Sequence, residues 1–132
     1  MTTHTDADAV RDVLARYALT LDVEDLDGCL RLFTSDAEYI VYGKTLTGER
    51  IRRMFIRAPK GLHLTGAAVV EVQDDTAHAR SQILFVDVST GQSRSAIYDD
   101  ELVRNASNGW QIRRRQCQFL TPEGLSQTPY EG

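Results

Sequence analysis

The first half of the chain has the hydrophobic period of helices. Apolar residues recur about every 3.6 positions over 10–21, and Thr5 stands before them where it can cap a helix. A second, short helix is expected over 25–33 and a third over 47–56, where a capping sequence opens it. One short strand, 37–42, is expected between these two helices. This part therefore predicts three helices and a strand.

From residue 62 onward the period changes to two, which is typical of strands with one face buried. Turn sequences separate four long strands, expected at Leu62–Gln73, Thr76–Val88, Gln92–Arg104 and Trp110–Leu120. Helices followed by a curled sheet predict an α+β domain, a cone-shaped barrel of a curved mixed or antiparallel sheet closed by the N-terminal helices. Such a cone has room for one small molecule.

Length and charge restrict the classes of function. A chain of 132 residues predicts one domain over 1–132, with irregular terminal segments at 1–5 and 121–132. The net charge of −4 is unsuited to neutralising phosphates, so nucleic acid is not expected as a partner. No apolar run approaches the roughly 20 residues that span a bilayer, and the N-terminus lacks the pattern of a signal peptide. We therefore expect no membrane partner and a cytoplasmic protein.

Neither the cysteines nor the histidines form a metal-binding pattern. Cys29 and Cys117 are far apart and belong to no ligand spacing, so two reduced, packed thiols are expected. The three histidines stand at unrelated spacings, and no glycine-rich loop that could cradle a phosphate is present in the sequence. We expect no metal and no cofactor, which leaves acid–base chemistry.

Asp22 and His63 are the candidates for that chemistry. Asp22 ends the apolar stripe of the first helix, where it either faces a cavity or is solvated at the helix terminus. His63 lies near the start of the first long strand, where it is either a proton acceptor or a core or rim residue. A carboxylate beside an imidazole fixes its tautomer and stabilises its cation, so together they would form a general base. His4 and His78 are expected to be solvated.

Tyrosines could supply the acid, because a phenol keeps its proton at neutral pH. Tyr17 shares the helix of Asp22, Tyr42 ends the short strand, and Tyr98 is a further candidate; a core role is expected for Tyr39. On the last strand, alternation places Arg114 on the face of Trp110 and Ile112 and Arg113 and Arg115 on the other. If the first of these faces lines the cone, Arg114 is a buried cation that needs an anion or a carbonyl.

Several stretches in order along nearly the whole chain resemble the SnoaL-like proteins of the nuclear-transport-factor-2-like superfamily, which includes polyketide cyclases, scytalone dehydratase, a bile-acid dehydratase and a dehydrochlorinase. They are Tyr17-Ala18-Leu19-Thr20-Leu21-Asp22, Asp25-Leu26-Asp27, Leu32-Phe33-Thr34-Ser35-Asp36-Ala37, His63-Leu64-Thr65-Gly66, Val69-Val70-Glu71-Val72, Tyr98-Asp99-Asp100-Glu101-Leu102-Val103-Arg104 and Gly109-Trp110-Gln111-Ile112.

The resemblance implies roles for particular residues. In catalytic members of this family an Asp ending the first helix and a His opening the first long strand form the general base, and Asp22 and His63 occupy those places. In individual members of the family, tyrosines at the matching positions supply the acid, which implies that role for Tyr17 and Tyr42. Where scytalone dehydratase has a second catalytic histidine, this chain has Asp87 or a neighbour, which argues against scytalone as substrate. Arg114 is the nearest match to an arginine of the dehydrochlorinase pattern. We therefore expect Tyr42, Asp87, Tyr98 and Arg114 to bind the substrate.

Two functions follow as hypotheses. The first is a cofactor-independent lyase or isomerase, dehydratase- or cyclase-like, acting on a small, mostly apolar molecule such as a polyketide, steroid or terpenoid. The alternative is a non-catalytic protein that binds a small molecule or serves as the small subunit of a larger enzyme. In either case the apolar residues on the outer face of the sheet predict a homodimer or homotrimer.

Overall fold

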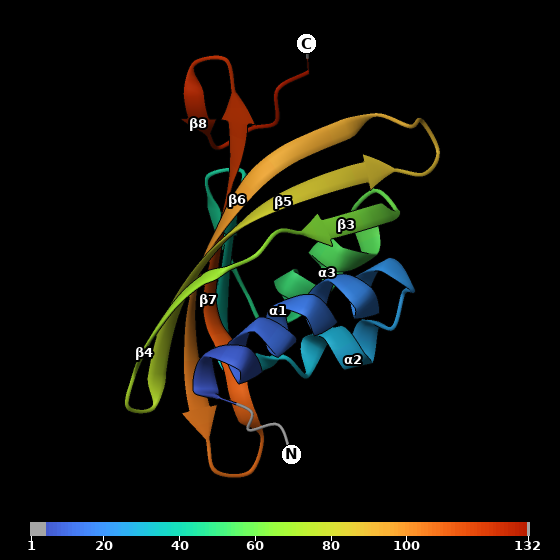
Figure 1. The fold of residues 1–132 in the computed structure, drawn as a ribbon. Helices are drawn as coiled ribbons and strands as arrows, with labels where there is room; N and C mark the ends of the chain where they lie inside the picture. Colours follow the sequence, from blue (N-terminus) through green and yellow to red (C-terminus); the bar gives the residue numbers. More distant parts are fainter. Residues whose placement is uncertain (1–4, 132) are drawn as a thin grey trace.

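A computed structural model describes residues 5–131 of the chain, which form helices packed on one side of a strongly curved sheet (Figure 1). The helices are α1 (Asp6–Asp22), α2 (Leu26–Leu30) and α3 (Glu49–Arg57). The strands are β1 (Phe33–Val41), β2 (Lys44–Thr47), β3 (Gly61–Thr65), β4 (Val69–Gln73), β5 (Thr76–Asp87), β6 (Ser93–Asn105), β7 (Gly109–Thr121) and β8 (Gly124–Ser126). None of the described helices is long and apolar enough to cross a membrane.

The first helix forms as its pattern predicts. The Thr5 hydroxyl accepts a hydrogen bond from the Asp8 amide at 3.1 Å, and the Asp8 side chain accepts one from the Thr5 amide. This capping box satisfies two of the amides that a helix leaves unpaired at its start. The apolar stripe of α1 is buried from Val10 to Ala18, so the helix packs its apolar face against the sheet.

The other two helices differ in detail from the sequence expectation. Asp25 caps α2 through the Gly28 amide, but the helix ends at Leu30, before Phe33. Phe33 instead opens β1, where it pairs with Ile112 of β7. The cap of α3 is Gly48, which has a φ of +53° and makes no side-chain capping hydrogen bond.

One mixed sheet contains all the strands, in the order β2-β1-β7-β6-β5-β3, with β4 also on β5 and β8 also on β7. The pairing of β1 with β7 is parallel and the others are antiparallel. The α+β class and the curved sheet are therefore as predicted. The sheet is open, with β2 at one edge and β3 and β4 at the other, and the helices lie against its concave face (Figure 1).

The strand prediction is also wrong at three further places. The first long strand is divided into β3 and β4, because the segment 66–68 leaves the ladder between them. A two-residue hairpin at Tyr42 and Gly43, both with positive φ, adds the unpredicted β2. Within the segment expected to be irregular, β8 pairs with the end of β7.

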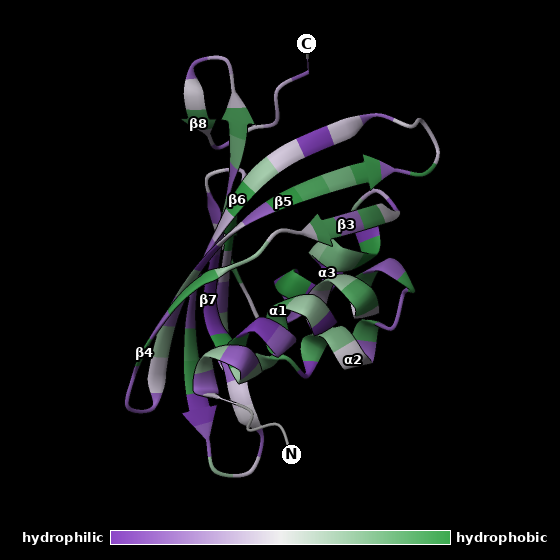
Figure 2. Cartoon of the chain, in the orientation of Figure 1, coloured by the Kyte–Doolittle hydropathy of each residue, from purple (hydrophilic) through white to green (hydrophobic). Residues whose placement is uncertain are grey.

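The core lies between the concave face of the sheet and the helices. Alternate residues of β5 from Ala77 to Ile83 are buried, and those between them are exposed. Near β3 this alternation weakens: Figure 2 shows a hydrophobic run along that end of β5, where apolar side chains occupy both faces. The inward residues of this end line the cavity described next.

Candidate active site

Asp22 and His63 are joined by two hydrogen bonds. Asp22 is the last residue of α1, and His63 lies in the middle of β3. The Asp22 Oδ1 atom lies 2.6 Å from His63 Nδ1, and Oδ2 accepts a hydrogen bond of 2.9 Å from the His63 backbone amide. Each side chain is 15% exposed. The carboxylate therefore fixes the ring, and Nε2 has no hydrogen-bond partner among the described residues.

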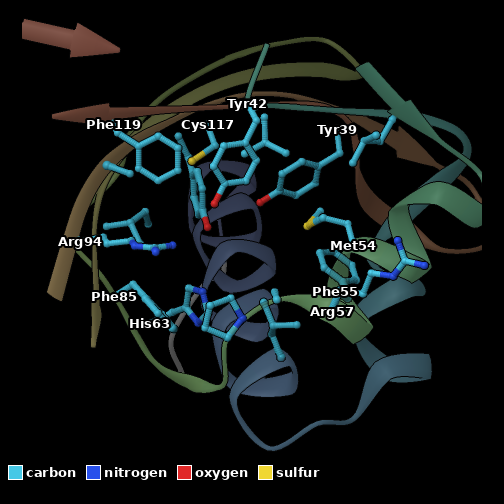
Figure 3. Close-up of a pocket in the computed structure, with 18 of the residues that line it drawn as sticks. Tyr39, Tyr42, Met54, Phe55, Arg57, His63, Phe85, Arg94, Cys117 and Phe119 are labelled. Atoms are coloured by element: carbon cyan, nitrogen blue, oxygen red, sulfur yellow. The ribbon is translucent and has the colours of Figure 1, made fainter. Parts of the chain in front are cut away.

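His63 lines a cavity of about 600 Å³ between the sheet and α3. Volumes of about 300–1,000 Å³ are typical of sites for small molecules. The wall is largely aromatic and aliphatic; its rings belong to Tyr17, Tyr39, Tyr42, Phe55, Phe85, Tyr98 and Phe119. The Phe85 ring lies beside the imidazole, with 4.7 Å between ring centroids. In the view of Figure 3, His63 lies across the cavity from Tyr39 and Tyr42.

Three buried phenols form one wall of the cavity. The hydroxyls of Tyr17 and Tyr39 are 3.0 Å apart, and Tyr98 packs edge-on against Tyr17. Burial holds the pKa values of Tyr17 and Tyr39 well above the ordinary 10.0 and raises that of Tyr98 to about 12. All three therefore keep their protons at neutral pH and can donate hydrogen bonds to an oxygen in the cavity. Tyr39, expected only in the core, is thus part of the cavity wall.

The arginine behind these phenols is Arg115, not Arg114. The Arg115 guanidinium is buried between the rings of Tyr17 and Tyr98, at 4.2 and 4.0 Å from their centroids. Asp100 binds it through two hydrogen bonds of 2.7 and 2.9 Å. Burial opposes the charged form, but the Asp100 carboxylate raises the pKa of Arg115 above its ordinary value.

A β-bulge explains why alternation selected the wrong arginine. Glu101 pairs with Arg114 and Leu102 with Ile112, so Arg113 is an extra residue that opposes none. The bulge places Arg115 on the buried face with Ile112 and turns Arg114 outward. There Arg114 is 41% exposed and lies 4.0 Å from Glu38. The expectation that Arg114 binds substrate is therefore corrected: it does not line the described cavity.

The remaining expected site residues are divided. Tyr42 lines the cavity at the β1–β2 hairpin, 46% exposed, with its ring against Phe119. Asp87 does not: its carboxylate accepts hydrogen bonds from the amide and hydroxyl of Ser89, which lower its pKa and shape the turn after β5. The structure thus gathers Asp22, His63, Tyr17, Tyr42 and Tyr98 at one site and leaves Asp87 outside it.

The cysteines are buried and separate. Cys117 lines the cavity, and burial raises the pKa of its thiol to about 12, so it is protonated at neutral pH. Cys29 packs beneath α1 in the core. No group of three or more His, Cys, Asp or Glu side chains in residues 5–131 is arranged to hold a metal ion.

The sequence matches a known family. Residues 2–116 match the family model of the SnoaL-like domain, and the chain belongs to that family. No curated protein matches the chain significantly.

Solved structures share the fold. An NTF2-like protein with a cystatin-like fold from Novosphingobium aromaticivorans is 26% identical, with a TM-score of 0.79 over 89% of this chain and 83% of that one. A putative scytalone dehydratase from the same species is 16% identical (TM-score 0.72; 94% and 88% of the two chains). A hexachlorocyclohexane dehydrochlorinase, LinA-type3, from Novosphingobium barchaimii is 20% identical (TM-score 0.74; 94% and 89%). At these last two identities the likeness concerns the fold.

Proposed function

We propose that the protein is a lyase or isomerase in which His63 is the general base. The observation that carries this proposal is the Asp22–His63 pair at the cavity. His63 Nδ1 is held 2.6 Å from Asp22 Oδ1, and His63 Nε2 has no partner among the described residues. Nε2 of the neutral ring would remove a proton from a carbon made acidic by a neighbouring carbonyl or by a leaving group. The Asp22 carboxylate would stabilise the imidazolium that forms.

The buried phenols would complete the reaction. As His63 takes the proton, negative charge develops on the carbonyl or leaving oxygen of the substrate. Tyr17, Tyr39 and Tyr98 hold their protons, and Tyr42 reaches the same cavity from the hairpin. Hydrogen bonds from one or more of these hydroxyls would stabilise that oxygen, and full transfer would release water or an enol. The names of the dehydratase and dehydrochlorinase of the same fold agree with such chemistry.

Exchange of carbon-bound hydrogen with solvent tests the proposal before the natural substrate is known. A panel of aromatic and alicyclic hydroxy-ketones is incubated with the protein in D₂O, and mass spectrometry measures deuterium gained at the carbon beside the carbonyl. His63 would remove a proton and the ring would return a deuteron from solvent. We expect His63→Ala to lower the exchange rate by roughly 10²- to 10⁴-fold.

A second histidine–aspartate pair provides a matched control. His78 Nε2 lies 2.8 Å from Asp99 Oδ1 on the outer face of the sheet, away from the cavity. His78→Ala should leave the exchange rate unchanged. If His63→Ala exchanges as fast as the unaltered protein, His63 is not the base. If the unaltered protein exchanges no faster than buffer alone, the non-catalytic binding protein becomes the better hypothesis.

A further inference from the structure

The charged residues that line the cavity are all basic, although the chain is acidic. The whole chain has a net charge of −4, yet no carboxylate belongs to the described lining. Five cations do, from the three elements β2, α3 and β6: Lys44, Arg50, Arg53, Arg57 and Arg94. Like charges gathered around one cavity create a positive potential inside it, because the low-dielectric walls focus the field. A neutral, mostly apolar substrate does not account for this arrangement.

Within the described residues, the cations of β2 and α3 that line the cavity lack acidic partners. Arg52 of α3 forms an ion pair with Asp27, with 3.2 Å between Nη1 and Oδ1. By contrast, no side-chain ion pair or hydrogen bond to another residue in 5–131 is made by Lys44, Arg50, Arg53 or Arg57. Their charges at the mouth of the cavity are therefore available to a ligand.

Arg94 brings a positive charge into the cavity itself. Along the sheet, His63 of β3 pairs with Phe85 of β5, and Phe85 pairs with Arg94 of β6, so the three residues form one row. Their side chains point to the same face, and two strand spacings of about 4.8 Å separate the backbones of His63 and Arg94 by about 10 Å. Figure 3 shows the Arg94 side chain reaching into the cavity on the side of Phe85 and His63.

The guanidinium of Arg94 has no hydrogen-bond partner in the described part of the chain. Its charge acts on Asp87, but that carboxylate already accepts hydrogen bonds from Ser89 and Thr90. A guanidinium has five N–H donors in a fork that matches a carboxylate or phosphate. A half-buried group of this kind, left unpaired inside an apolar cavity, has the chemistry of an anion-binding site.

We propose that the cavity binds an organic anion: an apolar ring body lies against the aromatic wall, and its carboxylate or phosphate is held by Arg94. The cations of β2 and α3 attract the molecule to the mouth. The next step rests on the proposed function of His63 as the base. In the row His63–Phe85–Arg94 the anionic group would lie to one side of the reacting carbon, with the Phe85 ring between the two. The anion therefore determines which carbon reaches His63.

Two fluorescent probes with the same ring body test the preference for an anion. 8-Anilino-1-naphthalenesulfonate carries a sulfonate, and N-phenyl-1-naphthylamine lacks it. Because hydrogen bonds to charged groups contribute about 1.5–3 kcal/mol, the anionic probe should bind the unaltered protein about 10- to 100-fold more tightly than the neutral one. Arg94→Gln should abolish this difference and leave the affinity for the neutral probe unchanged, which also shows that the cavity is intact.

Two further variants make the result specific. Arg80→Gln is the matched control, because Arg80 lies on the outer face of β5, 53% exposed and paired with Asp99; it should retain the preference for the anion. His63→Ala should retain it too, so that loss of catalysis and loss of anion binding are measured separately. Equal affinity of the unaltered protein for both probes, or an equal loss of both in Arg94→Gln, would overturn the proposal.

Competition distinguishes the kind of anion. 2-Naphthoate and 2-naphthyl phosphate are each titrated against the bound sulfonate probe, with 2-naphthamide as the neutral control. Displacement by the carboxylate alone assigns the site to carboxylates, and stronger displacement by the phosphate assigns it to phosphate esters. If 2-naphthamide displaces the probe as well as both anions do, charge is not recognised and the proposal fails.

Discussion

The Asp22 carboxylate binds His63 at two places, the ring nitrogen Nδ1 at 2.6 Å and the backbone amide at 2.9 Å. One side chain at the end of α1 thus fixes both the orientation of the imidazole and the position of β3. The backbone contact makes the placement of the base independent of the substrate, because the strand itself is bound to the helix end. Preorganisation of this kind is what proton transfer by a side chain requires.

Removing the carboxylate should change the tautomer of His63. With Asp22 in place, the neutral ring carries its proton on Nδ1, which leaves the Nε2 lone pair for the substrate. In Asp22→Ala the proton should move largely to Nε2, and the exchange rate should fall by at least about 10-fold, up to the roughly 10²- to 10⁴-fold that a positioned base contributes. Long-range ¹⁵N–¹H NMR of the imidazole measures the tautomer directly. Unchanged ring resonances in Asp22→Ala would contradict the assignment.

The buried pair of Arg115 and Asp100 should be the most costly polar contact to break. These side chains are 1% and 0% exposed, so a variant that removes one leaves an uncompensated charge in the core. We expect Arg115→Met to lower the free energy of unfolding by about 3–5 kcal/mol, and Arg115→Met with Asp100→Leu to recover much of that loss. Urea denaturation measures both. Arg114→Met is the control, because an exposed pair contributes about 0–1 kcal/mol.

That same region shows what the sequence could not reveal. Strict alternation from Ile112 selects Arg114 as the buried arginine, and the structure buries Arg115 because Arg113 is a bulge. A bulge adds one residue to a strand without changing its composition, so hydrophobic period alone does not locate it. The buried partner Asp100 was equally hidden, since a lone acid on a strand is ordinarily exposed.

The site itself was more predictable than its strands. The stripe of α1 ends at Asp22, and His63 lies at the start of the first predicted long strand. The resemblance to the SnoaL-like family supported both, so the pair was expected before the structure. Arg94 was missed, although it alternates with Ala96 and Tyr98 and so had to share their inward face. The β1–β2 hairpin was missed because its turn places Tyr42 at a φ of +55°, a conformation for which Asn or Gly is the usual signal.

Alkaline pH should destabilise the protein through its buried phenols. Burial raises the pKa of Tyr98 from 10.0 to about 12. Below pH 10 the phenol is protonated in both states and its contribution is complete; above pH 10 the unfolded state loses the proton first, so stability falls as the pH approaches 12. For Tyr98 alone this loss is about 2 kcal/mol at pH 11.5. Urea titrations at pH 9 and 11.5 measure it.

The variant Tyr98→Phe isolates that contribution. Between the two pH values, the free energy of unfolding of this variant should fall by about 2 kcal/mol less than that of the unaltered protein, because the variant has no phenol to ionise at this position. Tyr130→Phe is the control: Tyr130 is 55% exposed, and its removal should not alter the dependence on pH. Parallel losses in Tyr98→Phe and the unaltered protein would show that Tyr98 does not contribute to the alkaline transition.

The outer face of the sheet carries a band of exposed leucines. Leu64 pairs with Leu84 across β3 and β5, and Leu120 pairs with Leu125 across β7 and β8; each is between 39% and 52% exposed. Leu64, Leu84 and Leu120 line one shallow hollow on this face. We propose that copies of the chain associate through this band as a dimer or trimer, because monomers seldom expose contiguous apolar area of this kind.

Charges placed in the band should dissociate the oligomer. Light scattering during size-exclusion chromatography should give two or three times the mass of one chain at micromolar concentration. Leu64→Glu with Leu84→Glu should reduce this to the mass of one chain, because the interface would have to bury unpaired carboxylates. Leu19→Glu, on the exposed side of α1 and 65% exposed, is the control that should leave the mass unchanged. A single-chain mass for the unaltered protein would refute the association, and an unchanged mass in the double variant would exclude this face as its site.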